Sequence, residues 1–84
     1  MNRTSQPYVE AFPRGTRVRV LELEALEQFR AEWKWHHPIQ PEQMHYAGAE
    51  AIVESVGFYH GGDVLYQLQG VPGTWHESCL SAAT

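Results

Sequence analysis

The stretch Gly57-Phe-Tyr-His-Gly-Gly-Asp-Val-Leu-Tyr-Gln-Leu68 decides the fold class of this chain of 84 residues. Its centre, His60-Gly-Gly-Asp63, predicts a tight turn, because glycines adopt the positive φ angles that hairpin turns need. Residues 64–68 then alternate between two faces. One face carries Val64, Tyr66 and Leu68, and the other carries Leu65 and Gln67. The stretch therefore predicts a β-hairpin within a mainly β protein.

The pattern remains β on both sides of this hairpin. Upstream, residues 49–59 are predicted to form a long strand in which Gly57 marks a bulge or bend. Downstream, residues 69–73 form a second turn. A short strand over 74–77, one helical turn over 78–80 and a frayed end over 81–84 are expected after it.

The N-terminal half contributes one strand and one helix. Residues 16–21 alternate, which puts Val18 and Val20 on a buried face. From 23 to 35 the apolar spacing becomes helical, and Pro38 ends the predicted helix. Its apolar stripe is expected to be its core face and consists of Leu26, Phe29 and Trp33. A further helical turn is predicted at 41–44, and residues 1–12 are predicted to be a flexible tail before a single domain over 13–84.

The order of these elements and several short motifs resemble SH3-like barrels. The motifs are Gly15-Thr-Arg-Val-Arg-Val20, His36-His-Pro38, Ala47-Gly-Ala-Glu-Ala-Ile-Val53, Leu65-Tyr66 and the segment from Trp75 to Leu80. Within that class the chain is most similar to the electron-transport accessory group. This group includes the C-terminal domain of the nitrile hydratase β subunit and the variable chain of ferredoxin-thioredoxin reductase. A weaker resemblance is to the Mind bomb-type SH3-like repeats.

The resemblance implies a small five-stranded SH3-like barrel with one helix inserted after the first strand. It also implies a non-catalytic role, because barrels of the accessory group rest against a partner subunit and the repeats bind peptides. The chain departs from the accessory group in lacking Lys and Arg after Lys34, where such chains lend arginines to the partner's site. We therefore expect a protein-binding or accessory module, a small subunit or regulator of an enzyme complex, with no cofactor of its own.

The charge distribution disfavours nucleic acid as a partner. The net charge is -4, and all six basic residues lie within the first 34 positions. Binding to a phosphate backbone depends on clustered Lys and Arg. The expected partner is therefore a protein or a larger enzyme subunit and not a nucleic acid.

The compartment is predicted from three features of the sequence. Cys79 is the single cysteine, so no disulfide can form within the chain. The first residues lack an apolar signal region, and no apolar run approaches the roughly 18 residues of a membrane span. We expect a cytoplasmic protein that does not enter the membrane, while its oligomeric state stays open.

Aromatic residues are the leading candidates for the binding site. In an SH3-like barrel the excursion after the first strand and the turn before the last strand flank one groove. This arrangement predicts an exposed aromatic shelf made of Trp35, Tyr46, Tyr59 and Trp75. Trp and Tyr commonly anchor protein interfaces. The alternative is a core role, in which Trp75 fills the barrel.

Histidines and Cys79 offer a second candidate site, because imidazole and thiolate bind transition metals. His76 and Cys79 are three residues apart, which suits one helical turn. A third ligand would come from His36, His37 or His45. The alternative function is therefore transition-metal binding, with His76, Cys79 and His37 as the ligand set. Surface histidines and a buried, apolar Cys79 are the simpler interpretation.

No motif in the sequence points to catalysis. His76, Glu77 and Cys79 are too close in sequence to converge as base, orienting group and nucleophile. Gly61-Gly62 lacks the Lys and Ser or Thr of a phosphate-binding loop. We therefore expect no enzyme activity, with a small enzyme built by homo-oligomerisation as the remaining alternative.

Overall fold

The computed structural model describes residues 10–59 and 62–83, and its strands form one antiparallel sheet in the order β4-β3-β2-β1-β5. The elements are β1 (Arg17–Val20), α1 (Leu23–Glu32), η1 (Pro41–Tyr46), β2 (Glu50–Tyr59), β3 (Asp63–Leu68), β4 (Val71–His76), η2 (Glu77–Cys79) and β5 (Leu80–Ala82). The mainly β class with a helix after the first strand is confirmed. Within the described residues no pairing joins β4 to β5, so the sheet is open.

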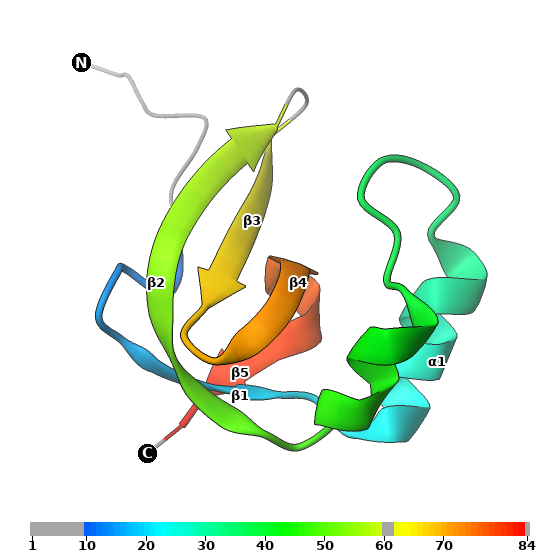
Figure 1. Cartoon of the computed structure of the whole chain (residues 1–84). Helices are drawn as coiled ribbons and strands as arrows, with labels where there is room; N and C mark the ends of the chain where they lie inside the picture. The colour runs from blue at the N-terminus through cyan, green and yellow to red at the C-terminus, as the bar shows by residue number, and fades with distance from the viewer. Residues whose placement is uncertain (1–9, 60–61, 84) are drawn as a thin grey trace.

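Strand β2 is bent (Figure 1). Its N-terminal part pairs with β1, and the rest of it pairs with β3. Of the bulge or bend predicted at Gly57, the bulge is wrong, because Gly57 pairs regularly with Leu65. The register shifts between Val53 and Ser55 instead, which leaves Glu54 as the extra residue. A bulge increases the local bend and twist of a strand. The sequence signal was weak because Glu54 lacks the conformational signature of glycine.

The last strand, β5, was not predicted from the sequence, because residues 81–84 were expected to fray. Leu80–Ala82 instead pairs with β1, with Leu80 opposite Val20. Pairing satisfies backbone groups of β1 that would otherwise form an exposed edge. Three residues are too few to display an alternating pattern, which explains the wrong prediction.

The core is centred on Tyr66 and Trp75, which face each other across β3 and β4 and are both fully buried. The expected burial of Val18 and Val20 is confirmed. Leu65, predicted on the opposite face of β3 from Tyr66, is buried as well, while Gln67 on the same face is exposed. The other buried apolar side chains are Leu26, Ile39, Val53, Val64, Leu68, Val71, Cys79 and Leu80.

The N-terminal segment joins this core earlier than expected. Residues 1–9 of the predicted tail lie outside the described residues, but the ring of Phe12 lies 5.7 Å from that of Tyr66. The backbone N–H of Phe12 donates to the Tyr66 hydroxyl at 3.3 Å, and that of Ala11 donates to Glu77 at 2.9 Å. The packed region therefore begins before residue 13.

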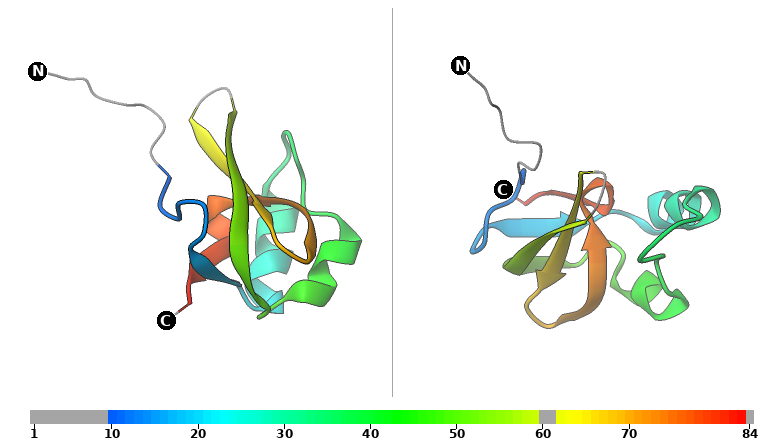
Figure 2. Two further views of the ribbon diagram at one scale, coloured as in Figure 1. Left: turned by 60° about the vertical axis from the view of Figure 1, so that its left-hand side comes forward. Right: turned by 90° about the horizontal axis from the view of Figure 1, so that it is seen from above.

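Helix α1 ends at Glu32 and not at Trp35 as predicted. Trp33 has an extended backbone, and its N–H still donates to the carbonyl of Phe29 at 2.8 Å. The indole N–H of Trp33 donates to the carbonyl of His36 at 2.6 Å, which stabilises a loop in place of another helical turn. This loop projects from the same end of the molecule as the β2–β3 hairpin (Figures 1 and 2). No described helix is long and apolar enough to cross a membrane.

The buried side chain of Gln43 ties η1 to β4. Its amide oxygen accepts from the N–H of Gln40 at 2.8 Å, and its amide nitrogen donates to the carbonyl of Thr74 at 3.2 Å. The predicted helical turn at 41–44 is thus confirmed and extends to Tyr46. Gly73, next to Thr74, has a φ of 100° and no side chain to displace Gln43.

Gly73→Ala is expected to destabilise the protein by about 1–3 kcal/mol, because a Cβ would combine a left-handed backbone with a close contact. The added Cβ would lie 2.6 Å from the amide nitrogen of Gln43. Gly57→Ala is the matched control, since nothing lies within 4 Å of its added Cβ. That change should alter stability by less than about 1 kcal/mol. Urea denaturation at 25 °C measures both; equal losses would contradict the role of Gly73.

Candidate functional site

A cluster of aromatic and imidazole rings forms where the 33–37 loop meets the end of the β2–β3 hairpin. The ring of His36 stacks on Tyr59 with a centroid distance of 3.8 Å and an interplanar angle of 23°. His37 meets the same tyrosine edge-on at 5.2 Å. Two segments that are more than 20 positions apart in the sequence therefore share one surface.

Trp33 lies beneath this surface and connects it to α1. Its ring stacks on Phe29 at 5.5 Å and contacts His76 at 4.7 Å. It meets Trp35 and His36 edge-on at 5.0 and 5.3 Å. Trp33 therefore supports the exposed rings from below. We use the term aromatic patch for Trp35, His36, His37 and Tyr59.

Hydrogen bonds fix the loop against the hairpin and β4. His36 Nε2 lies 2.6 Å from Asp63 Oδ2, and His36 Nδ1 lies 2.9 Å from His37 Nδ1. His76 Nε2 lies 2.8 Å from the carbonyl oxygen of His37. Neutral rings satisfy all three contacts if His36 and His76 donate through Nε2 and His37 through Nδ1. His37 also has a φ of 51°, a left-handed backbone held by these contacts.

Two of the four predicted shelf residues lie in the aromatic patch. Trp35 is 65% exposed and Tyr59 is 37% exposed. Tyr46 is half-buried in η1 and packs against the core. The prediction of an exposed Trp75 is wrong: its side chain has 0% exposure because β4 directs it inward opposite Tyr66. Phe58 is also exposed, but its side chain lies on the opposite face of β2 from that of Tyr59.

The alternative metal set His76, Cys79 and His37 is not assembled. His76 bonds the backbone of His37 and not a shared centre, and its side chain is buried, not at the surface. Cys79 is buried, as its apolar interpretation predicts, and burial raises the pKa of its thiol to about 12. Over residues 10–59 and 62–83, no three His, Cys, Asp or Glu side chains are placed to hold a metal ion.

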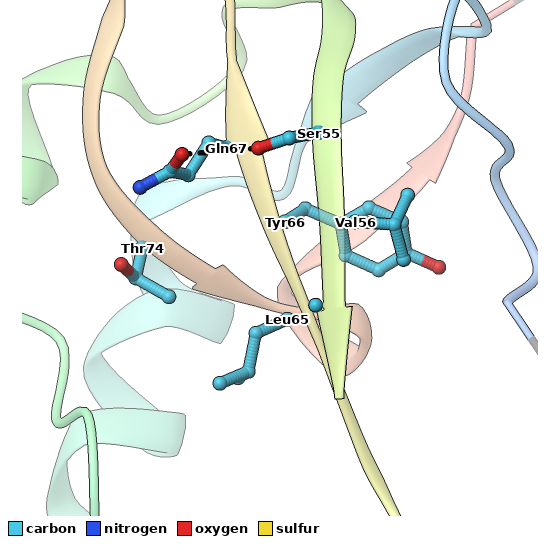
Figure 3. Close-up of a pocket in the computed structure, with 7 residues that line it drawn as sticks. Ser55, Val56, Leu65, Tyr66, Gln67 and Thr74 are labelled. Atoms are coloured by element: carbon cyan, nitrogen blue, oxygen red, sulfur yellow. Dashed lines mark hydrogen bonds between the residues drawn. The ribbon is translucent and has the colours of Figure 1, made fainter. Parts of the chain in front are cut away.

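A separate pocket of about 270 Å³ lies on the sheet between β2, β3 and β4 (Figure 3). Leu65 and Thr74 point to one side of β3, away from Tyr66 and Val56. The polar groups of the pocket include the hydroxyl of Ser55, which lies 3.0 Å from the side-chain oxygen of Gln67. The described side chains that line this pocket include no carboxylate, imidazole, thiol or amine. The pocket therefore offers no pair of groups for acid–base catalysis.

The contact of Asp63 with His36 and the central position of Trp33 were not predicted from the sequence. Asp63 was assigned to a turn, and Trp33 to the core stripe of a helix, yet both hold the aromatic patch in place. The available signal was the pair His36-His37 directly after an aromatic helix end. That signal does not identify which distant carboxylate meets the histidines.

Trp75→Ala should destabilise the protein by about 3–5 kcal/mol, the usual cost of truncating a buried aromatic side chain. Trp35→Ala provides the matched comparison, because it removes the same ring from a largely exposed position. Its cost should be less than about 1 kcal/mol. Denaturant unfolding of the two variants measures this difference; similar losses would mean that Trp35 also belongs to the core.

Acidification is expected to destabilise the fold partly through His76. Burial lowers the pKa of His76 from its ordinary value of 6.5, so the unfolded chain takes up the proton first. This contribution to stability is present above about pH 6.5 and is lost as the pH falls through the lowered pKa. Unfolding free energies between pH 8 and 5 should decrease more for the wild type than for His76→Gln, which does not titrate. Identical pH dependence would contradict this role of His76.

No protein-family model, curated protein sequence or solved structure matches the chain. The resemblance to SH3-like barrels therefore depends on the order of the elements and on the short motifs.

Proposed function

We propose that the chain is a non-catalytic protein-binding or accessory module, and that its aromatic patch contacts the partner. The observation that carries this proposal is the 65% exposure of Trp35 beside the stacked pair of His36 and Tyr59. Large aromatic rings held at a surface are typical anchors of protein interfaces. A partner that covers these rings would gain the free energy of removing apolar area from water.

The patch is supported from beneath, which favours binding. Trp33 packs under Trp35, and the bond between His36 and Asp63 holds the loop to the hairpin. Groups that are already ordered lose less conformational entropy when a partner binds. The patch therefore has the properties of a preformed contact surface.

A binding role also agrees better with the titratable groups than a catalytic one. His36 and His76 direct hydrogen bonds at Asp63 and at a backbone carbonyl, and the Cys79 thiol is buried. A nucleophile needs an accessible, activated side chain next to a base. No observation in the described residues favours the metal-binding alternative.

An SH3-like barrel is part of the same proposal. Its support is the element order: a first strand, a helical excursion, a bent strand with a hairpin, and a single 3-10 turn before the last strand. A cytoplasmic location and a larger enzyme subunit as the partner remain predictions from the sequence.

Trp35→Ala and Tyr59→Ala are expected to reduce partner recovery at least about tenfold, as truncation of interface anchors does. Tagged variants would be used to capture proteins from the native host, with quantitative mass spectrometry as the readout. Leu23→Ala is the control, because Leu23 is 45% exposed at the start of α1 and does not contribute to the patch.

The result that supports the proposal is a protein lost with both patch variants and retained with Leu23→Ala. Melting temperatures of all three variants should stay close to that of the wild type. If every captured protein is retained by Trp35→Ala and Tyr59→Ala, the aromatic patch is not a protein-binding surface.

A further inference from the structure

A small pocket adjoins the aromatic patch, between α1, the start of β3 and η2. Its volume is about 220 Å³. This is below the range of roughly 300–1,000 Å³ for pockets that enclose a drug-sized ligand. The residues that line it are Phe29, Trp33, Gly62, Asp63, Val64, His76, Glu77 and Ser78. Its size suits one long side chain of a partner.

One side of the pocket is aromatic. Phe29 and Trp33 stack on each other with an interplanar angle of 14°, and His76 packs against both rings at 4.9 and 4.7 Å. The faces of aromatic rings carry partial negative charge and attract cations within about 6 Å. The contact with His76 adds no opposing charge near neutral pH, because burial lowers the pKa of this imidazole.

The other side carries two carboxylates with unused acceptor capacity. Asp63 accepts from His36 through Oδ2, and Glu77 accepts from Tyr66 and Ala11 through Oε2. In the described part of the chain no hydrogen bond reaches Asp63 Oδ1 or Glu77 Oε1. A carboxylate can accept several hydrogen bonds, and those from a cation are the strongest.

Positive charge is absent from the described lining of the pocket. Neither Lys nor Arg is among its residues, and Arg30 of α1 lines a different hollow with Glu27 and Pro38. From residue 35 onward the chain has five carboxylates and no Lys or Arg. The pocket is therefore complementary to a positively charged group.

We propose that this pocket binds an arginine side chain of the protein partner, a role that rests on the proposed protein-binding function. The planar guanidinium can lie against the Phe29 and Trp33 rings while its N–H groups donate to Asp63 and Glu77. Lysine fits less well, because its ammonium is a strongly hydrated point charge that does not stack. Trp33 belongs to the pocket wall and also contacts Trp35, so a partner on the aromatic patch reaches both.

The test uses N-acetyl-arginine N-methylamide as the probe, titrated into the ¹⁵N-labelled full chain and followed by NMR. The expected result is saturable shifts of the Trp33 indole N–H and of the Gly62, Asp63 and Ser78 amides. The dissociation constant should be on the order of 1–10 mM, as for other weak single-group contacts. The uncharged citrulline analogue and the lysine analogue should bind at least about fivefold more weakly.

Asp63→Asn is the decisive variant, because its amide oxygen can still accept from His36 while the charge is removed. It should weaken arginine binding about tenfold. Glu54→Gln removes the same charge from an exposed position on β2 and should change binding less than twofold. The measurement on the wild type remains decisive if Asp63→Asn fails to fold.

The proposal is overturned if arginine causes no saturable shifts, if citrulline or lysine binds as well, or if the shifts lie outside the pocket. It is also overturned if Asp63→Asn and Glu54→Gln weaken arginine binding equally, since that result would indicate only long-range attraction to the net negative charge of the protein. If arginine does not bind but Trp35→Ala still loses the partner protein, the aromatic patch is the interface and the pocket does not hold an arginine. Specific arginine binding without an effect of Trp35→Ala overturns the proposed function instead.

Discussion

The burial of Trp75 against Tyr66 is the interaction on which the rest of the fold depends. A chain of 84 residues has room for only a thin core, so two fully buried aromatic side chains supply a large part of it. They also fix the pairing of β3 with β4. The Tyr66 hydroxyl then donates to Glu77 at 2.5 Å, which brings η2 and the segment at Ala11 onto the same core.

The aromatic patch is built on this core without being part of it. Strand β3 begins at Asp63, and β4 ends at His76, which pairs with Leu65 of β3. The side chains of Asp63 and His76 hold the loop that follows α1. The position of the exposed rings therefore depends on the pairing of β3 with β4 in the core. This separation explains why Trp35 is largely exposed while Trp75 is fully buried.

Local patterns predicted the elements better than the site. The alternation at Val18 and Val20 and the glycine-rich hairpin sequence sufficed for the strands, because neighbouring residues impose strand faces and turns. The end of α1 could not be predicted, since Trp33 leaves the helix to meet Phe29, His36 and His76, one of which is 43 positions away. The inward direction of Trp75 depends likewise on its partner strand, and no local pattern reports it.

The open edge at β4 has a consequence for how copies of this chain meet. An exposed edge strand offers unpaired N–H and C=O groups to a second chain, and this is a route to aggregation. Here Pro72 lacks an N–H, and the register with β3 shifts across residues 71–75. The carbonyl of Thr74 is already occupied by Gln43. The same glutamine that anchors η1 thus also occupies a hydrogen-bond acceptor of this edge strand, so variants at Gln43 should be judged by their solubility as well as by their stability.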